Sequence, residues 1–96
     1  MYSEPEGPVP NTFFNLGYVY AVTENYPQAK TMYSKVVDLS PSFLDEALFN
    51  LAMVNVQLGE HRQCQANLQR AIDINPENEA AKAYLQKLKQ SEGNDL

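Results

Sequence analysis

The chain has 96 residues, of which 44% are hydrophobic, with a formal net charge of −5 and one cysteine. This length suffices for one domain with a modest core, and it is too short for a buried catalytic cleft with a lid. Four acidic residues lie near the ends (Glu4, Glu6, Glu92 and Asp95), so the rest of the chain is nearly neutral. Because no basic stripe could neutralise phosphates, we expect neither nucleic-acid binding nor association with anionic membrane surfaces.

The cysteine count and the N-terminal composition bear on the compartment in which the protein is found. One cysteine excludes an internal disulfide framework and is compatible with a reducing compartment, so we expect a cytoplasmic protein. No run of 18 apolar residues occurs, which argues against a transmembrane helix. Residues 1–10 contain three prolines and one glycine and lack the pattern of a signal peptide. We predict a flexible N-terminal tail over residues 1–10.

From residue 11 onward, apolar residues recur every three or four positions, which predicts helices. Five helices are expected, over residues 11–24, 27–39, 42–58, 61–74 and 77–90. Ser42 and Asp45 predict a capping box at the start of the third helix, and Gly59 stands where a left-handed cap should end it. The fifth helix has a narrow apolar stripe and a polar back, as a capping helix requires. Residues 91–96 form a polar tail.

A seven-residue pattern occurs twice in the chain. The segment 35–41 reads KVVDLSP and the segment 70–76 reads RAIDINP, with the same chemistry at each position. The same offset of 35 positions relates Phe14-Asn15-Leu16 to Phe49-Asn50-Leu51. A period of about 20–50 residues indicates stacked supersecondary units. Repeat one therefore spans about residues 10–44 and repeat two about residues 45–78.

Aromatic, small and proline residues are spaced alike in both repeats. Repeat one has Phe13, Leu16-Gly17, Tyr20, Ala29, Tyr33 and Pro41, and repeat two has Leu48, Leu51-Ala52, Asn55, Cys64, Leu68 and Pro76. This pattern resembles the tetratricopeptide repeat family. The resemblance covers residues 11–90 and implies an all-α, TPR-like α-solenoid of two antiparallel helical hairpins plus one capping helix. Small residues such as Gly17 would lie where paired helices approach closely, and Leu16 would fill the space between helices.

The same resemblance implies a non-catalytic protein–protein interaction module. In this family the first helix of each hairpin lines a concave face. Positions there that packing does not use include Ala21 and Gln57, and several others are too apolar for a solvated face. The candidate partner-binding residues are Phe14, Asn15, Tyr18, Val22, Phe49, Asn50, Met53 and Val56. Phe14 and Phe49 are equivalent and should lie side by side. We expect an apolar groove that takes a peptide or helix of a partner protein.

An alternative is a structural or self-association unit. The concave face would then pack on the chain's own tail, on another repeat of a larger scaffold or on another copy. One family subtype is not expected, because the carboxylate clamp that grips chaperone C-terminal tails is absent. Only Asn50 matches a clamp position, whereas Phe14 and Tyr18 replace a clamp lysine and asparagine.

Candidates for catalysis or metal binding are few. His61 and Cys64 lie three positions apart and could supply two metal ligands, whereas a structural zinc site needs four. The acidic pairs Asp45-Glu46 and Glu77-Glu79 fall at predicted helix starts, where the helix dipole accounts for them. We therefore expect no enzyme activity, no metal and no cofactor.

Overall fold

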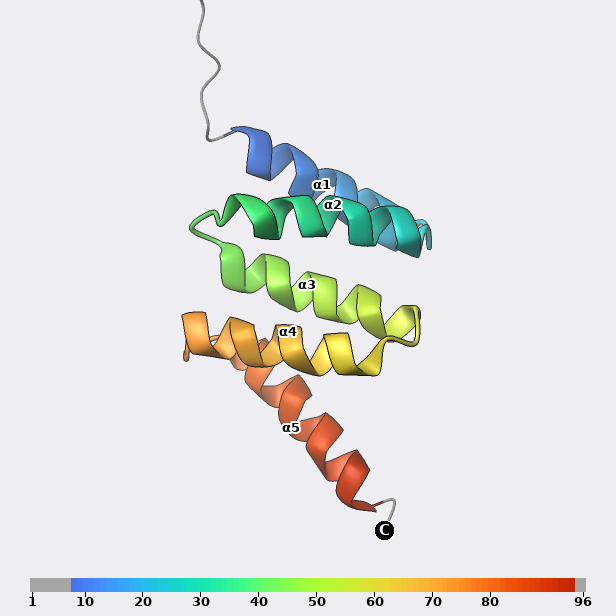
Figure 1. Ribbon diagram of the computed structural model, residues 1–96, viewed down its shortest axis with the longest axis vertical. Coiled ribbons are helices and arrows are strands. Elements are labelled where there is room, and N and C mark those ends of the chain that lie inside the picture. Colours follow the sequence, from blue (N-terminus) through green and yellow to red (C-terminus); the bar gives the residue numbers. More distant parts are fainter. Residues whose placement is uncertain (1–7, 95–96) are drawn as a thin grey trace, which may run out of the picture.

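The computed structural model of the chain describes residues 8–94, in which all regular structure is helical. The five helices are α1 (Pro8–Val22), α2 (Tyr26–Leu39), α3 (Leu44–Gln57), α4 (His61–Ile74) and α5 (Glu79–Asn94). Figure 1 shows α1 with α2, and α3 with α4, as two hairpins stacked in chain order, with α5 running obliquely from the end of the stack. The predicted all-α solenoid of two hairpins and a capping helix is confirmed.

The first helix begins at Pro8, earlier than the predicted start at Asn11. Pro8 and Pro10 fall in its first turn, where backbone N–H groups have no partner within the helix, so a missing donor there breaks no hydrogen bond. Three residues of the predicted tail are thus helical, and residues 1–7 lie outside the described part. At the other end, α5 continues to Asn94, through most of the predicted polar tail.

The start of α3 differs from the predicted capping box. The helix begins at Leu44, its N-cap residue is Phe43, and no side chain caps it. Asp45 bonds elsewhere: its Oδ2 accepts hydrogen bonds from Nδ2 of Asn75 at 3.0 Å and from Nδ2 of Asn78 at 2.8 Å. The carboxylate therefore joins the start of α3 to the turn between α4 and α5. At the other end, Gly59 has φ +75°, the left-handed conformation predicted for it.

These hydrogen bonds have an electrostatic consequence for Asp45. Partial burial acts to raise the pKa of this carboxyl, but hydrogen bonds from the Asn75 and Asn78 amides and from the backbone of Asp45 and Glu46 together outweigh it and hold the pKa below its usual value. Asn78 also caps α5, since its Oδ1 accepts from the backbone N–H of Ala81 at 3.0 Å.

A second polar network fixes the turn between α3 and α4. Asn55 is 1% exposed; its Nδ2 donates to Oε1 of Glu60 at 2.9 Å, and its Oδ1 accepts from Nδ2 of Asn67 at 2.9 Å. Glu60 also pairs with Lys30 of the first hairpin, at 2.8 Å. The Lys30 and Asn55 bonds lower the pKa of Glu60. Asn55, which stands where repeat one has Tyr20, thus binds the same glutamate that links the two hairpins.

The apolar core runs between the hairpins and under α5. Its fully buried large side chains include Tyr33, Val36, Leu48 and Leu68. Gly17 lies against Tyr33, where an added Cβ would meet the ring at 2.7 Å, so the predicted close approach of α1 and α2 is present. Leu16, in contrast, was expected to fill the space between helices and is 41% exposed, because no helix within residues 8–94 covers that side of α1.

Candidate functional site: the groove between α1 and α3

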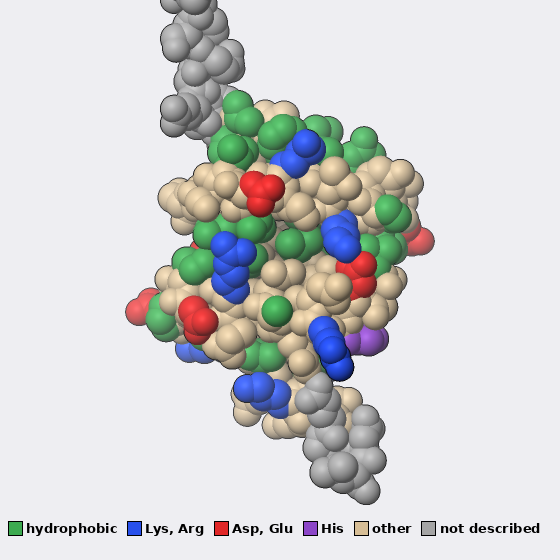
Figure 2. All heavy atoms as spheres, in the orientation of Figure 1, with side chains coloured by type: hydrophobic (Ala, Val, Ile, Leu, Met, Phe, Trp, Pro, Cys, Tyr) green, Lys and Arg blue, Asp and Glu red, His purple; other side chains and the backbone are tan. Residues whose placement is uncertain are grey.

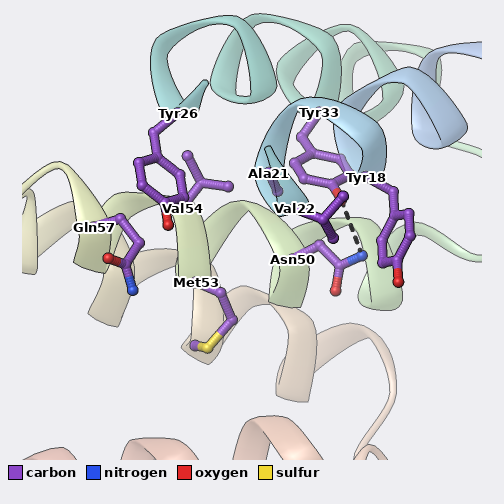
Figure 3. Close-up of a pocket in the computed structure, with 9 residues that line it drawn as sticks. All are labelled: Tyr18, Ala21, Val22, Tyr26, Tyr33, Asn50, Met53, Val54 and Gln57. Carbon is purple, nitrogen blue, oxygen red and sulfur yellow. Dashed lines mark hydrogen bonds between the residues drawn. The ribbon is translucent and has the colours of Figure 1, made fainter. Parts of the chain in front are cut away.

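An open groove of about 280 Å³ lies between the first helices of the two hairpins, with α2 behind it. It is lined by Tyr18, Ala21, Val22, Tyr26, Tyr33, Asn50, Met53, Val54 and Gln57. Figure 3 shows Tyr26 and Gln57 at one end of the groove and Tyr18 at the other. The lining residues thus come from α1, α2 and α3.

One wall of the groove is exposed apolar surface on α1. Tyr18 and Val22 stand four positions apart, so they fall on one helix face one turn from each other. Their exposed fractions are 57% and 58%, although both are large hydrophobic residues. Met53, from α3, supplies a half-buried thioether on the opposite side. Methionine side chains are flexible and adapt to the shape of a ligand, so the α3 side of the groove can accommodate different apolar groups.

The floor of the groove is formed by the buried Tyr33 and by Asn50, which are hydrogen-bonded to each other. The ring of Tyr33 is buried, and its oxygen accepts a long hydrogen bond, 3.5 Å, from Nδ2 of Asn50. Burial raises the pKa of Tyr33, and the nearby Tyr18 raises it further, against the opposing effect of the Asn50 hydrogen bond. The phenol is therefore neutral near pH 7 and holds the Asn50 side chain at the groove floor.

The lining of the groove is uncharged. None of its lining residues carries a formal charge at neutral pH, and its polar groups are amides and phenols. Its volume lies just under the range of about 300–1,000 Å³ that is typical of small-molecule pockets. The groove is therefore small, and the Asn50 and Gln57 amides lie along it.

Four of the eight predicted binding residues line this groove: Tyr18 and Val22 on α1, and Asn50 and Met53 on α3. Asn15 is exposed on α1 but is not part of the lining. The other three predicted residues are half-buried and pack against the core.

The phenylalanines in particular do not form an exposed pair. The Phe14 ring meets the rings of Tyr33 and Phe43 edge to face, with centroids 5.6 and 5.3 Å apart. Phe49 and Val56 pack against the buried cluster from α3. A second hollow, of about 650 Å³, lies between the start of α1 and the α2–α3 turn, and none of the eight predicted residues lines it.

Three lining residues were not predicted from the sequence: Tyr26, Tyr33 and Val54. Tyr33 and Val54 fall on the core pattern, and each reaches the groove only with its edge. Tyr26 precedes the predicted start of α2, and its aromatic side chain at a helix corner is the one signal that could have indicated it.

The residues considered for metal binding do not come together as a site. Cys64 is 1% exposed, and burial raises the pKa of its thiol, so it packs as a small apolar residue. His61 is exposed at the start of α4. In the described part of the chain, no three His, Cys, Asp or Glu side chains cluster closely enough to hold a metal ion.

The helices within residues 8–94 were also considered as membrane spans, and none has the length and hydrophobicity that a span requires.

Comparison with known proteins agrees with the observed hairpins. The family model described as Tetratricopeptide repeat matches residues 10–43 and 45–78, which correspond to α1 with α2 and to α3 with α4. A search of curated proteins found no match. Tetratricopeptide repeats are generally protein–protein interaction modules and form non-catalytic scaffolds. The two matched segments together cover well over half of the chain, which therefore belongs to the tetratricopeptide repeat family.

Proposed function

We propose that the groove between α1 and α3 binds a short extended segment of a partner protein, anchored by one large apolar side chain. The observation that carries the proposal is the uncharged lining of the groove, in which Tyr18 and Val22 remain more than half exposed. Apolar side chains gathered in a concave surface commonly mark a protein interaction site.

The partner's anchor would contact Tyr18, Val22 and Met53. Burial of apolar area supplies the affinity, at about 25 cal/mol per Å² before the costs of association are subtracted. The amides of Asn50 and Gln57 lie along the same groove and can bond main-chain groups of the partner. An extended segment has such groups unpaired, whereas a helix has satisfied them internally, and this favours an extended ligand.

A displayed library of random peptides tests the proposal and requires no named partner. Peptides selected on the wild-type chain should share a large apolar residue and bear few charges. Tyr18→Ala and Met53→Ala should each weaken the selected peptide about tenfold or more, since truncation at the centre of an interface often costs about 2 kcal/mol.

Leu39→Ala and Ile74→Ala serve as matched controls, because these side chains are 47% and 45% exposed and do not line the groove. They should leave the affinity unchanged. Failure to select any peptide, or equal weakening by the control variants, would contradict the proposal.

A further inference from the structure

The outer side of α1 exposes apolar residues whose equivalents in the second repeat are buried. We define the outer stripe of α1 as Thr12, Leu16, Val19 and Thr23, which are spaced four, three and four positions apart and so lie on one side of the helix; Thr23 directly follows its last residue. All four residues are exposed, and Leu16 and Val19 are 41% and 53% exposed. Figure 2 shows hydrophobic side chains gathered along the edge of the molecule formed by α1.

The equivalent stripe of α3 shows what this face is suited to. Thirty-five positions on, the same places are occupied by Ala47, Leu51, Val54 and Leu58. Leu51 and Val54 are 7% and 2% exposed, because α3 packs between α2 and α4. Leucine and valine thus occupy the same two places in both repeats, and a packed helix covers them in the second. The outer stripe of α1 has the character of a helix-packing face, and no helix within residues 8–94 packs on it.

Charge distinguishes α1 from the other helices. Its 15 residues include no Asp, Glu, Lys or Arg, whereas each of the other four helices carries at least two. When a surface associates with its own copy about a two-fold axis, a central charge meets the same charge on the partner. Helix α1 is free of this repulsion, so its outer stripe is compatible with itself.

At the other end of the stack, the described surface of α5 is more polar. Helix α5 covers α4 with Ala81 and Leu85, and its remaining face exposes Lys82, Gln86 and Lys89. Head-to-tail stacking would press the apolar stripe of α1 against these polar side chains and is disfavoured. Contact of α1 with α1 leaves both α5 helices in water and ends at two chains.

We propose that two copies of this chain associate through their α1 outer stripes, as a two-fold symmetric dimer. Leu16 and Val19 of each copy lie at its centre. Specific stable interfaces bury about 1,200–2,000 Å² in total, and a single pair of helices of this length, about 22 Å, buries less. The dimer is therefore weak, with a dissociation constant of about 1 μM or higher.

Sedimentation of the whole chain from about 0.1 μM to about 1 mM, a range that begins below such a constant, tests the proposal. The average mass should rise with concentration toward that of two chains. Val19→Glu places two like charges near the axis and should weaken association more than about tenfold while helicity by circular dichroism is retained. Ile74→Glu alters a residue on α4 that is 45% exposed, and it should dimerise like the wild type.

A cross-link provides a second measurement that does not depend on a disruptive charge. Near a two-fold axis a residue meets its own copy, so Val19→Cys should oxidise to a disulfide-linked pair and Ile74→Cys should not. A wild-type chain that remains monomeric throughout, or a Val19→Glu chain that dimerises as well as wild type, would overturn the proposal. So would loss of association in Met53→Glu instead, which would place the contact in the groove.

Discussion

Replacement of Gly17 by alanine probes the packing of the first hairpin behind the groove. An added Cβ would lie 2.7 Å from Cε1 and 2.8 Å from Cδ1 of Tyr33, whereas carbon atoms prefer about 3.5–4.0 Å. The ring cannot easily yield. Tyr33 is 2% exposed, Phe14 packs against its ring, and its oxygen accepts a hydrogen bond from Asn50. The two helices must therefore separate or the ring must leave its position.

Two opposing terms set the size of the effect. Overpacking a buried position costs about 1–3 kcal/mol. Alanine favours a helix interior over glycine by about 1 kcal/mol, which offsets part of that cost. Gly17→Ala should therefore lower the free energy of unfolding by about 1 kcal/mol, equivalent to a Tm lower by about 4–8 °C in a domain of this size.

Urea and thermal unfolding followed by circular dichroism measure this difference, and a double-mutant cycle assigns its cause. In a Tyr33→Leu background the ring is gone, so Gly17→Ala should become neutral or stabilise by up to about 1 kcal/mol. A Gly17→Ala chain with a higher Tm than wild type would refute the close approach of α1 and α2.

Three further predictions concern the polar networks and the cysteine. Asn55→Ala removes a buried amide together with its hydrogen bonds to Glu60 and Asn67, and it should cost about 2 kcal/mol in urea titrations. Lys30→Met breaks a partly exposed ion pair and should cost less than about 1 kcal/mol. Equal losses would contradict the assigned roles. The pKa of Asp45 is lower in the folded state, so its stabilising contribution is present above about pH 4 and is lost as the pH falls through the folded value. Asp45→Asn should therefore flatten the decline of Tm on acidification, and an unchanged pH profile would argue against the Asp45 hydrogen bonds. Cys64 should react with a thiol reagent only after unfolding, because it is 1% exposed and burial raises its pKa; labelling at the rate of a free thiol would show that α4 is not packed as described.

The sequence predicted the helices and their stacking because both depend on local and periodic signals. Apolar spacing, Gly59 and the doubled proline pattern each act within a few residues of the chain. The boundaries that differ have specific causes. Pro8 and Pro10 are tolerated in a first helical turn, so α1 begins at Pro8 and not at Asn11. Asp45 has the spacing of a capping-box residue, but amides 30 and 33 positions further on bind its carboxylate instead.

The position of a residue in the repeat determines which helix face it lies on, so part of the groove lining was predicted. It does not determine how each side chain is rotated, so the rest was not. Tyr18 and Val22 lie far enough around α1 to stay exposed. Phe14 lies on the same helix, yet its ring turns inward to Tyr33 and Phe43. Only the packed structure distinguishes these outcomes, since each residue has the same apolar chemistry.

Chemical-shift mapping tests the central claim, that the groove between α1 and α3 is the partner-binding surface, most directly. Isotope-labelled chain would be titrated with the tightest peptide from the library selection and followed by nuclear magnetic resonance. The largest shifts should fall on residues that line the groove, namely Tyr18, Val22, Asn50, Met53 and Gln57, with α4 and α5 little changed. Shifts concentrated on α4 and α5, or on the α2–α3 turn, would contradict it.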